Sequence, residues 1–261
     1  MSRIEKTFAA LKRPALITFI TAGDPDYARS MAIMKALPEA GADIIELGMP
    51  FTDPMADGPV IQAAGLRALE SGANMHKTLQ MVREFRQTNG KTPIVLMGYA
   101  NPLYAYGLRQ FVDDAVKAGV DGLIIVDLPP EEDGELHKIA AAKLDIIRLL
   151  TPTTDEKRLP KVLQGASGFL YYVSVTGVTG AAKADLDTVK PHIAQIRKHA
   201  DLPIAIGFGI KTAEDVARMA GIADAVVVGS AIVQNIADHQ GKADLAQRIV
   251  EQIKSLAAGL R

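Results

Sequence analysis

Short apolar runs alternate with longer helical patterns along almost the whole of this chain. The runs are near-continuously apolar, which is typical of strands that are buried on both faces of a parallel sheet. Between them, apolar residues recur at three- and four-residue spacing, as expected for helices with one buried face. The eight runs are 15–23, 42–48, 93–100, 121–128, 145–152, 168–174, 203–209 and 223–230. Helices are expected over Ile4–Lys12, Leu108–Ala118, Glu131–Ala142, Thr188–His199 and Thr212–Met219.

The number of repeats and the length of the chain favour one fold. Eight βα units in 261 residues fit an α/β fold, the (β/α)8 TIM barrel, with a short extra N-terminal helix and an extra helix after strand 8. A doubly wound open sheet is the alternative. That fold has fewer strands and usually a Gly-rich turn after the first, whereas the first run here ends TAGDPD. No linker or charge block divides the sequence, so residues 1–261 are expected to form a single domain.

The composition narrows the classes of function. The 29 basic and 30 acidic residues are intermixed, so the chain has no overall field that would attract nucleic acid or an anionic membrane. The cysteine count of zero excludes disulfides, thiolate catalysis and cysteine-type zinc sites, and it fits a reducing compartment. No signal peptide is visible, and the apolar runs are too short to span a bilayer. We therefore expect a cytoplasmic protein with no nucleic-acid or membrane partner.

Three long connections follow apolar runs, at 49–59, 101–108 and 175–187. In a barrel these segments are strand-to-helix loops at the C-terminal ends of the strands. Active sites lie at that end of barrel enzymes, so we expect these loops to build the site.

Two glycine clusters, IGFGI (206–210) and VGSAIV (228–233), end the last two apolar runs. Loops after strands seven and eight of a barrel commonly bind phosphate, and a helix that begins near Ser230 would offer free N–H groups to an anion. A third cluster, TGVTG (176–180), could close over the same anion as a lid. The alternatives are that the glycines serve only tight turns and that the third cluster is a disordered loop. The predicted phosphate-binding residues are Gly180, Gly207, Phe208, Gly209, Gly229 and Ser230.

Glu46 stands where the second apolar run ends, at the start of ELGMPFTDPMADGP (46–59). Side chains alternate along a strand, so Ile44 and Glu46 share one face while Ile45 and Leu47 share the other. If the second pair packs under helices, Glu46 points into the barrel near its rim. Desolvation there raises the pKa of an unpartnered carboxyl toward the range useful for proton transfer. The alternative is a glutamate that forms a salt bridge inside the barrel.

Three aspartates also follow strands at the same predicted end. Asp57 could reach over the mouth of the barrel, although Asp57 and Asp53 are also typical of Asx turns. Asp127 is a further candidate, and its alternative role is to cap the helix that begins near Glu131. The residue pattern alone does not rank these carboxylates.

With these features together, the chain closely resembles the tryptophan synthase alpha subunit family over essentially its whole length. The resemblance rests on ELGMPFTDPMADGP, YAN (99–101), VDLP (126–129), SVTGVTG (174–180), GFGI and VGSAIV. The family cleaves indole-3-glycerol phosphate to indole and glyceraldehyde 3-phosphate, in a retro-aldol reaction of L-tryptophan biosynthesis. The resemblance implies that Glu46 is the general acid and base, that Asp57 stabilises the indole N–H, and that Tyr171 lies close to both the substrate and Glu46.

The resemblance also implies the surroundings of the substrate. Thr179 would be the lid residue that meets the catalytic loop on closure. Two positions depart from the usual pattern, because Thr52 replaces a serine and Val175 stands where many relatives have arginine. The implied walls of the indole pocket are Phe19, Met97, Ile124 and Leu150.

The family works as an alpha2beta2 complex that passes indole to the beta subunit. The resemblance implies that this chain holds no cofactor and no metal, and that pyridoxal phosphate is bound only by the beta partner. It also implies docking through 50–53 and 101–104.

Two competing functions stay open on the residues alone. One is another phosphate-binding barrel enzyme, such as a sugar-phosphate isomerase or a Schiff-base aldolase; the aldolase needs a strand lysine, and no predicted strand has one in its interior. The other is a non-catalytic sensor of a phosphorylated metabolite.

Overall fold

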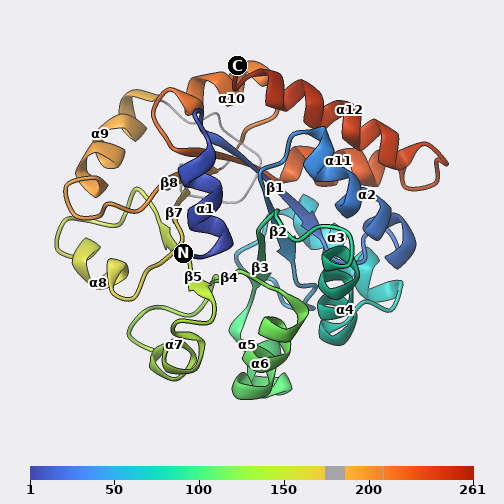
Figure 1. The fold of residues 1–261 in the computed structure, drawn as a ribbon, viewed down its shortest axis with the longest axis horizontal. Helices are drawn as coiled ribbons and strands as arrows, with labels where there is room; N and C mark the ends of the chain where they lie inside the picture. Colours follow the sequence, from blue (N-terminus) through green and yellow to red (C-terminus); the bar gives the residue numbers. More distant parts are fainter. Residues whose placement is uncertain (174–185, 208) are drawn as a thin grey trace.

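The strands of the protein form one curled parallel sheet. The computed structural model describes residues 1–173, 186–207 and 209–261. Within them, nine strands pair in the order β5-β4-β3-β2-β1-β9-β8-β7-β6, and every pairing is parallel. The result is the nearly closed (β/α)8 TIM barrel of Figure 1. The strands are β1 (Ala15–Thr21), β2 (Ile44–Gly48), β3 (Ile94–Gly98), β4 (Gly122–Ile125), β5 (Asp145–Ile146), β6 (Arg148–Leu150), β7 (Leu170–Val173), β8 (Ile204–Gly207) and β9 (Ala225–Val228).

Eight apolar runs become nine strands because the fifth run is divided. β5 pairs with β4 and β6 pairs with β7, while Ile147 lies between the two short strands. The N–H of Ile147 still donates to the carbonyl of Leu123, 3.0 Å away. The ring therefore closes through one continuous segment, and the number of βα units remains as predicted.

Helices surround the barrel on its outer side (Figure 1). The extra N-terminal helix is present, as predicted. Two helices follow the last strand; one completes the eighth βα unit and the other is the predicted extra helix. In the described ranges, no helix combines the length and the apolar character needed to cross a membrane. The helices are α1 (Arg3–Ala10), α2 (Tyr27–Ala40), α3 (Pro59–Glu70), α4 (Met75–Arg86), α5 (Ala100–Tyr106), α6 (Leu108–Ala118), α7 (Gly134–Ala140), α8 (Leu159–Leu163), α9 (Leu186–Ile196), α10 (Ala213–Ala220), α11 (Ser230–His239) and α12 (Leu245–Ala258).

One predicted loop is wrong, because most of 101–108 forms the helix α5. Pro102 lies in its first turn, where a residue without an N–H costs no hydrogen bond. The first N–H of the helix, at Ala100, donates to Oδ1 of Asp127, 2.8 Å away. Gly107, with φ of 93°, then separates α5 from α6. A seven-residue helix that depends on a distant acceptor has only a weak signal in the sequence.

Alternation along the strands produces two separate apolar layers. Ile44 packs in the barrel interior, whereas Ile45 and Leu47 pack between the sheet and the helices, as predicted. The residues of the interior layer are Ile4, Ala15, Ile17, Ile44, Val95, Ile124, Ile147, Phe169, Tyr171, Ala205, Ala225 and Val227.

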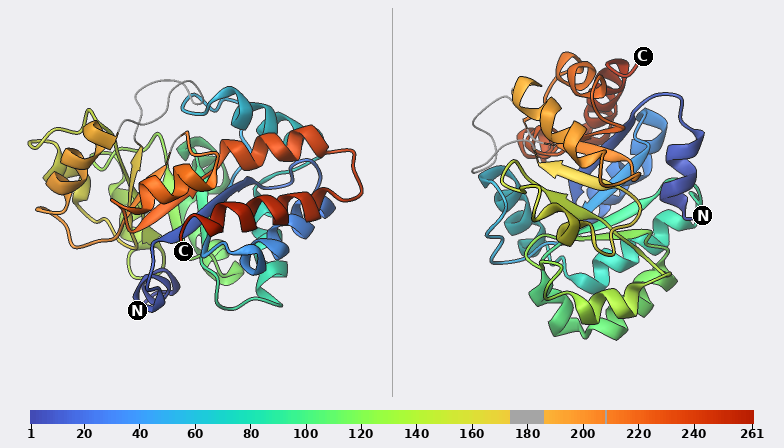
Figure 2. Two further views of the ribbon diagram at one scale, coloured as in Figure 1. Left: turned by 90° about the horizontal axis from the view of Figure 1, so that it is seen from above. Right: turned by 90° about the vertical axis from the view of Figure 1, so that its left-hand side faces the viewer.

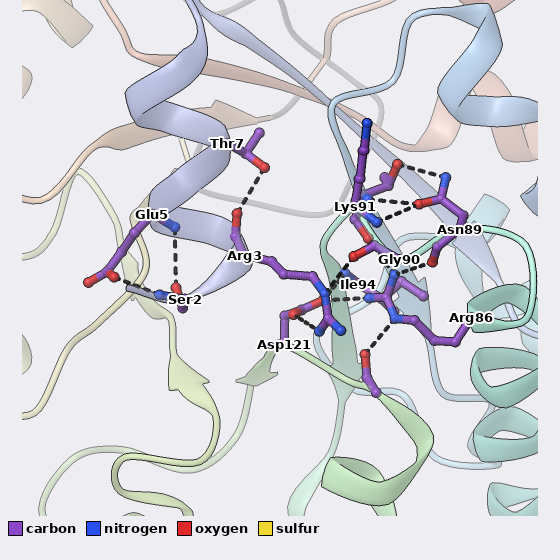
Figure 3. Close-up of polar contacts among 12 residues, drawn as sticks. Ser2, Arg3, Glu5, Thr7, Arg86, Asn89, Gly90, Lys91, Ile94 and Asp121 are labelled. Carbon is purple, nitrogen blue, oxygen red and sulfur yellow. Dashed lines mark hydrogen bonds and ion pairs between the residues drawn. The ribbon is translucent and has the colours of Figure 1, made fainter.

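α1 closes the N-terminal end of the barrel (Figure 2). Its Ile4 is fully buried in the interior layer, and its Phe8 ring lies 6.0 Å from the ring of Phe169. Beside it, Arg3 and Arg86 both point to Asp121 (Figure 3), with N···O distances of 2.8 and 2.6 Å. This end is therefore occupied by packed and paired side chains.

Candidate active site

A cavity of about 1010 Å³ opens at the C-terminal ends of the strands. Residues from nearly every side of the barrel contribute to it, so the site is assembled by the fold rather than by one segment. Its volume is at the upper end of the usual range for a small-molecule site. Among the lining residues are Phe19, Glu46, Asp57, Met97, Asp127, Leu149, Tyr171, Gly209, Lys211, Gly229 and Ser230.

Glu46 lines this cavity from β2 and is only 1% exposed. Its Oε1 has no hydrogen-bond partner within the described part of the chain. Burial raises the pKa of Glu46 to about 8, because the charged carboxylate loses its hydration. The side chain is therefore mostly protonated near neutral pH and suited to donate a proton.

Asp57 lies on the loop between β2 and α3, directly before Gly58, the N-cap of that helix. Its own N–H donates to the carbonyl of Pro54 at 3.0 Å, and the Gln62 side chain donates to its carbonyl at 2.8 Å. Burial raises the pKa of Asp57 to about 6, and a hydrogen bond from the Tyr99 hydroxyl counteracts part of that effect. Near pH 7 this carboxylate is therefore mostly ionised, unlike Glu46.

Tyr99 is a site residue that the sequence analysis missed. Its side chain is 2% exposed and its ring lies 5.5 Å from the ring of Phe51. The hydroxyl accepts a hydrogen bond from the N–H of Ala56 at 3.0 Å and donates one to the carboxylate of Asp57. Its place directly after β3, within YAN, is the signal that could have indicated it.

Tyr171 belongs to the interior layer of the barrel, whereas Tyr172 packs under the helices and hydrogen-bonds Nδ1 of His192 at 2.8 Å. Burial raises the pKa of the Tyr171 phenol, and the charge of Glu46 raises it further. A Cβ on Gly207 would lie 2.2 Å from the Tyr171 hydroxyl. Gly207 is thus the residue that leaves room for Tyr171.

The predicted phosphate-binding residues have different positions. Gly209, Gly229 and Ser230 line the cavity, and α11 begins at Ser230. The first N–H groups of an α-helix have no acceptor within the helix and favour an anion. Lys211 also lines the cavity, which the sequence analysis did not anticipate. Gly207 is buried at the end of β8, and Gly180, Phe208 and Thr179 lie outside the described residues, as does Val175.

The predicted indole walls are also distributed differently. Phe19 and Met97 line the cavity. Ile124 is fully buried in the interior layer. Leu150 packs in the outer layer between sheet and helices, so it is Leu149 that lines the cavity from β6. The prediction for Leu150 therefore had the wrong face of the strand.

The other predicted residues have structural contacts. Asp127 does not cap α7; it accepts the N–H of Ala100 and lines the cavity. Asp53 is exposed and accepts a hydrogen bond from the hydroxyl of Thr52. In the residues that the structure describes, no cluster of His, Cys, Asp and Glu could hold a metal ion.

Sequence and structure comparisons identify the relatives of the chain. Residues 6–261 match the family described as tryptophan synthase alpha chain. The chain is 41% identical to tryptophan synthase subunit alpha from Legionella pneumophila, with a TM-score of 0.92, covering 99% of this chain and 98% of the other. It is 33% identical to a chain of tryptophan synthase from M. tuberculosis in its aminoacrylate-bound form, with a TM-score of 0.89 and 100% of each chain covered. The chain therefore belongs to the tryptophan synthase alpha chain family, a lyase family that cleaves indole-3-glycerol phosphate in tryptophan biosynthesis.

Proposed function

We propose that this chain performs the retro-aldol cleavage with Glu46 and Asp57 as its two catalytic carboxylates. The observation that carries the proposal is that Glu46 is buried, with no partner for Oε1 among the residues that the structure describes, in a cavity that Asp57 also lines. The two carboxyls differ in protonation near pH 7, because their pKa values are about 8 and about 6. Opposite protonation states are what an acid and a charge-stabilising group need.

In this mechanism the protonated Glu46 delivers its proton to C3 of the indole ring. Positive charge develops on the ring nitrogen, and the Asp57 carboxylate stabilises it by accepting a hydrogen bond from the indole N–H. The ionised Glu46 then takes the proton of the adjacent glycerol hydroxyl. The carbon–carbon bond breaks, its electrons return to the ring, and an aldehyde forms. Glu46 ends the cycle protonated, as it began.

The phosphate group is assigned to the part of the cavity at the ends of β8 and β9. Gly209, Gly229 and Ser230 line the cavity there, and the start of α11 offers N–H groups and the positive end of a helix dipole. Lys211 adds a cation to the lining. We assign Gly180, Gly207 and Phe208 to the same phosphate site on the resemblance alone.

The indole ring would lie against apolar walls. Phe19, Met97 and Leu149 line the same cavity as Glu46, and Tyr171 of the interior layer lines it as well. We assign Thr179 to the lid that meets the catalytic loop, again from the resemblance. Excluding water in this way strengthens the electrostatic interactions around the reacting atoms.

The chain would deliver indole to a beta subunit, in an alpha2beta2 assembly. Support comes from the related tryptophan synthase structures of M. tuberculosis and from two exposed apolar side chains near 50–53 and 101–104, the segments assigned to docking. Met55 is 79% exposed and Tyr104 is 49% exposed. We further propose that pyridoxal phosphate is held by the partner alone, that residues 1–261 act as one domain, and that the protein works in the cytoplasm.

Indole release from indole-3-glycerol phosphate tests this function directly. The purified chain is assayed alone and with a saturating beta subunit. We expect indole in both assays and a faster release with the partner, because docking would order the loops at the mouth. Binding of the substrate without indole in either assay would contradict the proposal and favour a sensor of phosphorylated metabolites.

A further inference from the structure

We propose that Asp127 is a positioning residue that fixes Tyr99 and, through Tyr99, the carboxylate of Asp57. The proposal rests on the catalytic role assigned to Asp57 and adds a residue from a third loop. Asp127 follows β4, Tyr99 follows β3 and Asp57 follows β2, so the three residues come from adjacent strands of the barrel.

Three contacts connect these residues. Oδ1 of Asp127 accepts the N–H of Ala100 at 2.8 Å, and Ala100 directly follows Tyr99. The Tyr99 hydroxyl accepts the N–H of Ala56 at 3.0 Å and donates to the carboxylate of Asp57. Tyr99 thereby contacts both the backbone of Ala56, just before Asp57, and the side chain of Asp57. The backbone of Tyr99 is in turn held by Asp127.

The contact from Asp127 is more than a local cap. Ala100 is the first residue of α5, so its N–H has no acceptor within the helix and depends on Asp127. Without that acceptor the start of α5 can shift, and the Tyr99 hydroxyl moves with it. Hydrogen bonds weaken steeply when their geometry changes, so a small shift at Tyr99 is felt at Asp57.

A weaker hydrogen bond from Tyr99 changes the protonation of Asp57. The Tyr99 hydroxyl favours the ionised form of Asp57, so weakening that bond raises the pKa of the carboxyl. Less of the stabilising carboxylate is then present at a given pH. The other charged or titratable side chains that line the cavity are Glu46, Asp127, Asp133, Arg148, Asp155, Lys157, Arg158, Tyr171 and Lys211.

A pH profile of kcat/KM for indole release separates positioning from simple stability. The variants are Asp127→Ala, Asp127→Asn, Tyr99→Phe and the double variant Asp127→Ala with Tyr99→Phe. Asn74→Ala is the matched control, because Asn74 also accepts an N–H at the start of a helix, from Lys77 at 3.0 Å, and does not line the cavity in the part described. Thermal unfolding of each variant reports its stability.

We expect Tyr99→Phe and Asp127→Ala to move the acid limb of the profile to higher pH and to reduce kcat about fivefold at neutral pH, the effect of one hydrogen bond. Asp127→Asn keeps an oxygen acceptor for Ala100, so its profile stays close to that of the wild type. The double variant should show no further shift beyond Tyr99→Phe. Asn74→Ala should lower the unfolding temperature and leave the profile unchanged.

Two outcomes would overturn the inference. One is an unchanged acid limb in Asp127→Ala while Tyr99→Phe shifts it. The other is a full additional shift in the double variant, which would mean that Asp127 acts independently of Tyr99. A wild-type chain that releases no indole would instead refute the proposed function, so the two failures are distinguishable.

Discussion

The two ends of the barrel each contain a buried carboxylate, but the two carboxylates have different surroundings. At the N-terminal end, Asp121 accepts hydrogen bonds from Arg3, from Arg86 and from the N–H of Ile94, at 2.6 to 2.8 Å. At the C-terminal end, Glu46 is also buried, yet its Oε1 has no partner in the described residues. A paired carboxylate holds the ends of strands and helices together. An unpaired one costs stability and acquires a pKa useful for proton transfer.

Polar groups at the two ends of the barrel serve different purposes. In TIM barrels the N-terminal face generally serves stability and the C-terminal face serves the reaction. Here α1 fills the first face with apolar and ionic contacts, whereas a cavity remains at the second. Substitutions at the two ends should therefore separate activity from stability.

The largest effect is expected for Glu46→Gln. The amide cannot transfer the proton, so indole release should fall about 10²- to 10⁴-fold, while the shape of the side chain is kept. Steady-state indole release measures the loss, and binding of a phosphate-bearing substrate analogue serves as the control. Retained turnover would show that another group moves the proton.

Asp121→Ala should have the reverse effect, a loss of stability with little change in kcat. It removes a buried acceptor, so the N–H of Ile94 loses its side-chain partner and the buried Arg86 loses the carboxylate that balances its charge. We expect a loss of about 3 to 5 kcal/mol of unfolding free energy. Urea unfolding measures the loss. The kcat of the folded fraction should stay near that of the wild type, and Asp121→Asn, which keeps one oxygen acceptor, should lose less. A variant as stable as the wild type would show that the Asp121 contacts do not stabilise the N-terminal end of the barrel.

The pH dependence of the free energy of unfolding should report the raised pKa of Glu46. Its pKa is about 8 in the folded chain and near the ordinary glutamate value of 4.5 when the chain is unfolded. The folded state therefore holds the proton more tightly, and stability is fully present below about pH 4.5 and declines as pH rises toward about 8. We expect the free energy of unfolding of Glu46→Gln to decline less than that of the wild type between these limits. Parallel curves in urea titrations would contradict the assigned pKa.

A smaller effect is expected for Gly207→Ala. The added methyl group would meet Tyr171, so the variant should lose about 1 to 3 kcal/mol of stability and part of its activity. Gly241→Ala is the matched control, because a Cβ there has no heavy atom of the described residues within 4 Å beyond its chain neighbours. Thermal unfolding and indole release compare the two. Equal behaviour of both variants would mean that Tyr171 moves aside freely.

Much of this architecture was predictable from hydrophobic periodicity. The apolar runs predicted the strands, and the two-residue period predicted that Glu46 faces the interior. Periodicity failed at Leu149 and Leu150, since both are apolar. Arg148 gives a misleading cue there, because it is a charged residue on the same face of the strand as Leu150 and is nevertheless buried, in an ion pair with Asp133.

Other features depend on contacts between distant residues and have no local signal. Tyr99 contacts the loop at Ala56, which is 43 positions away in the sequence. The helix α5 depends on Asp127, which is 27 positions from Ala100. The residue pattern also left the carboxylates unranked, whereas burial in the folded chain gives Glu46 and Asp57 different pKa values.

The pH profile of kcat/KM for indole release by the wild-type chain tests whether Glu46 and Asp57 act in opposite protonation states. We expect a bell-shaped curve that falls below about pH 6, where Asp57 becomes protonated, and above about pH 8, where Glu46 loses its proton. A value of kcat/KM that stays constant from about pH 7 to about pH 10 would contradict these roles, because a protonated Glu46 would then not be required.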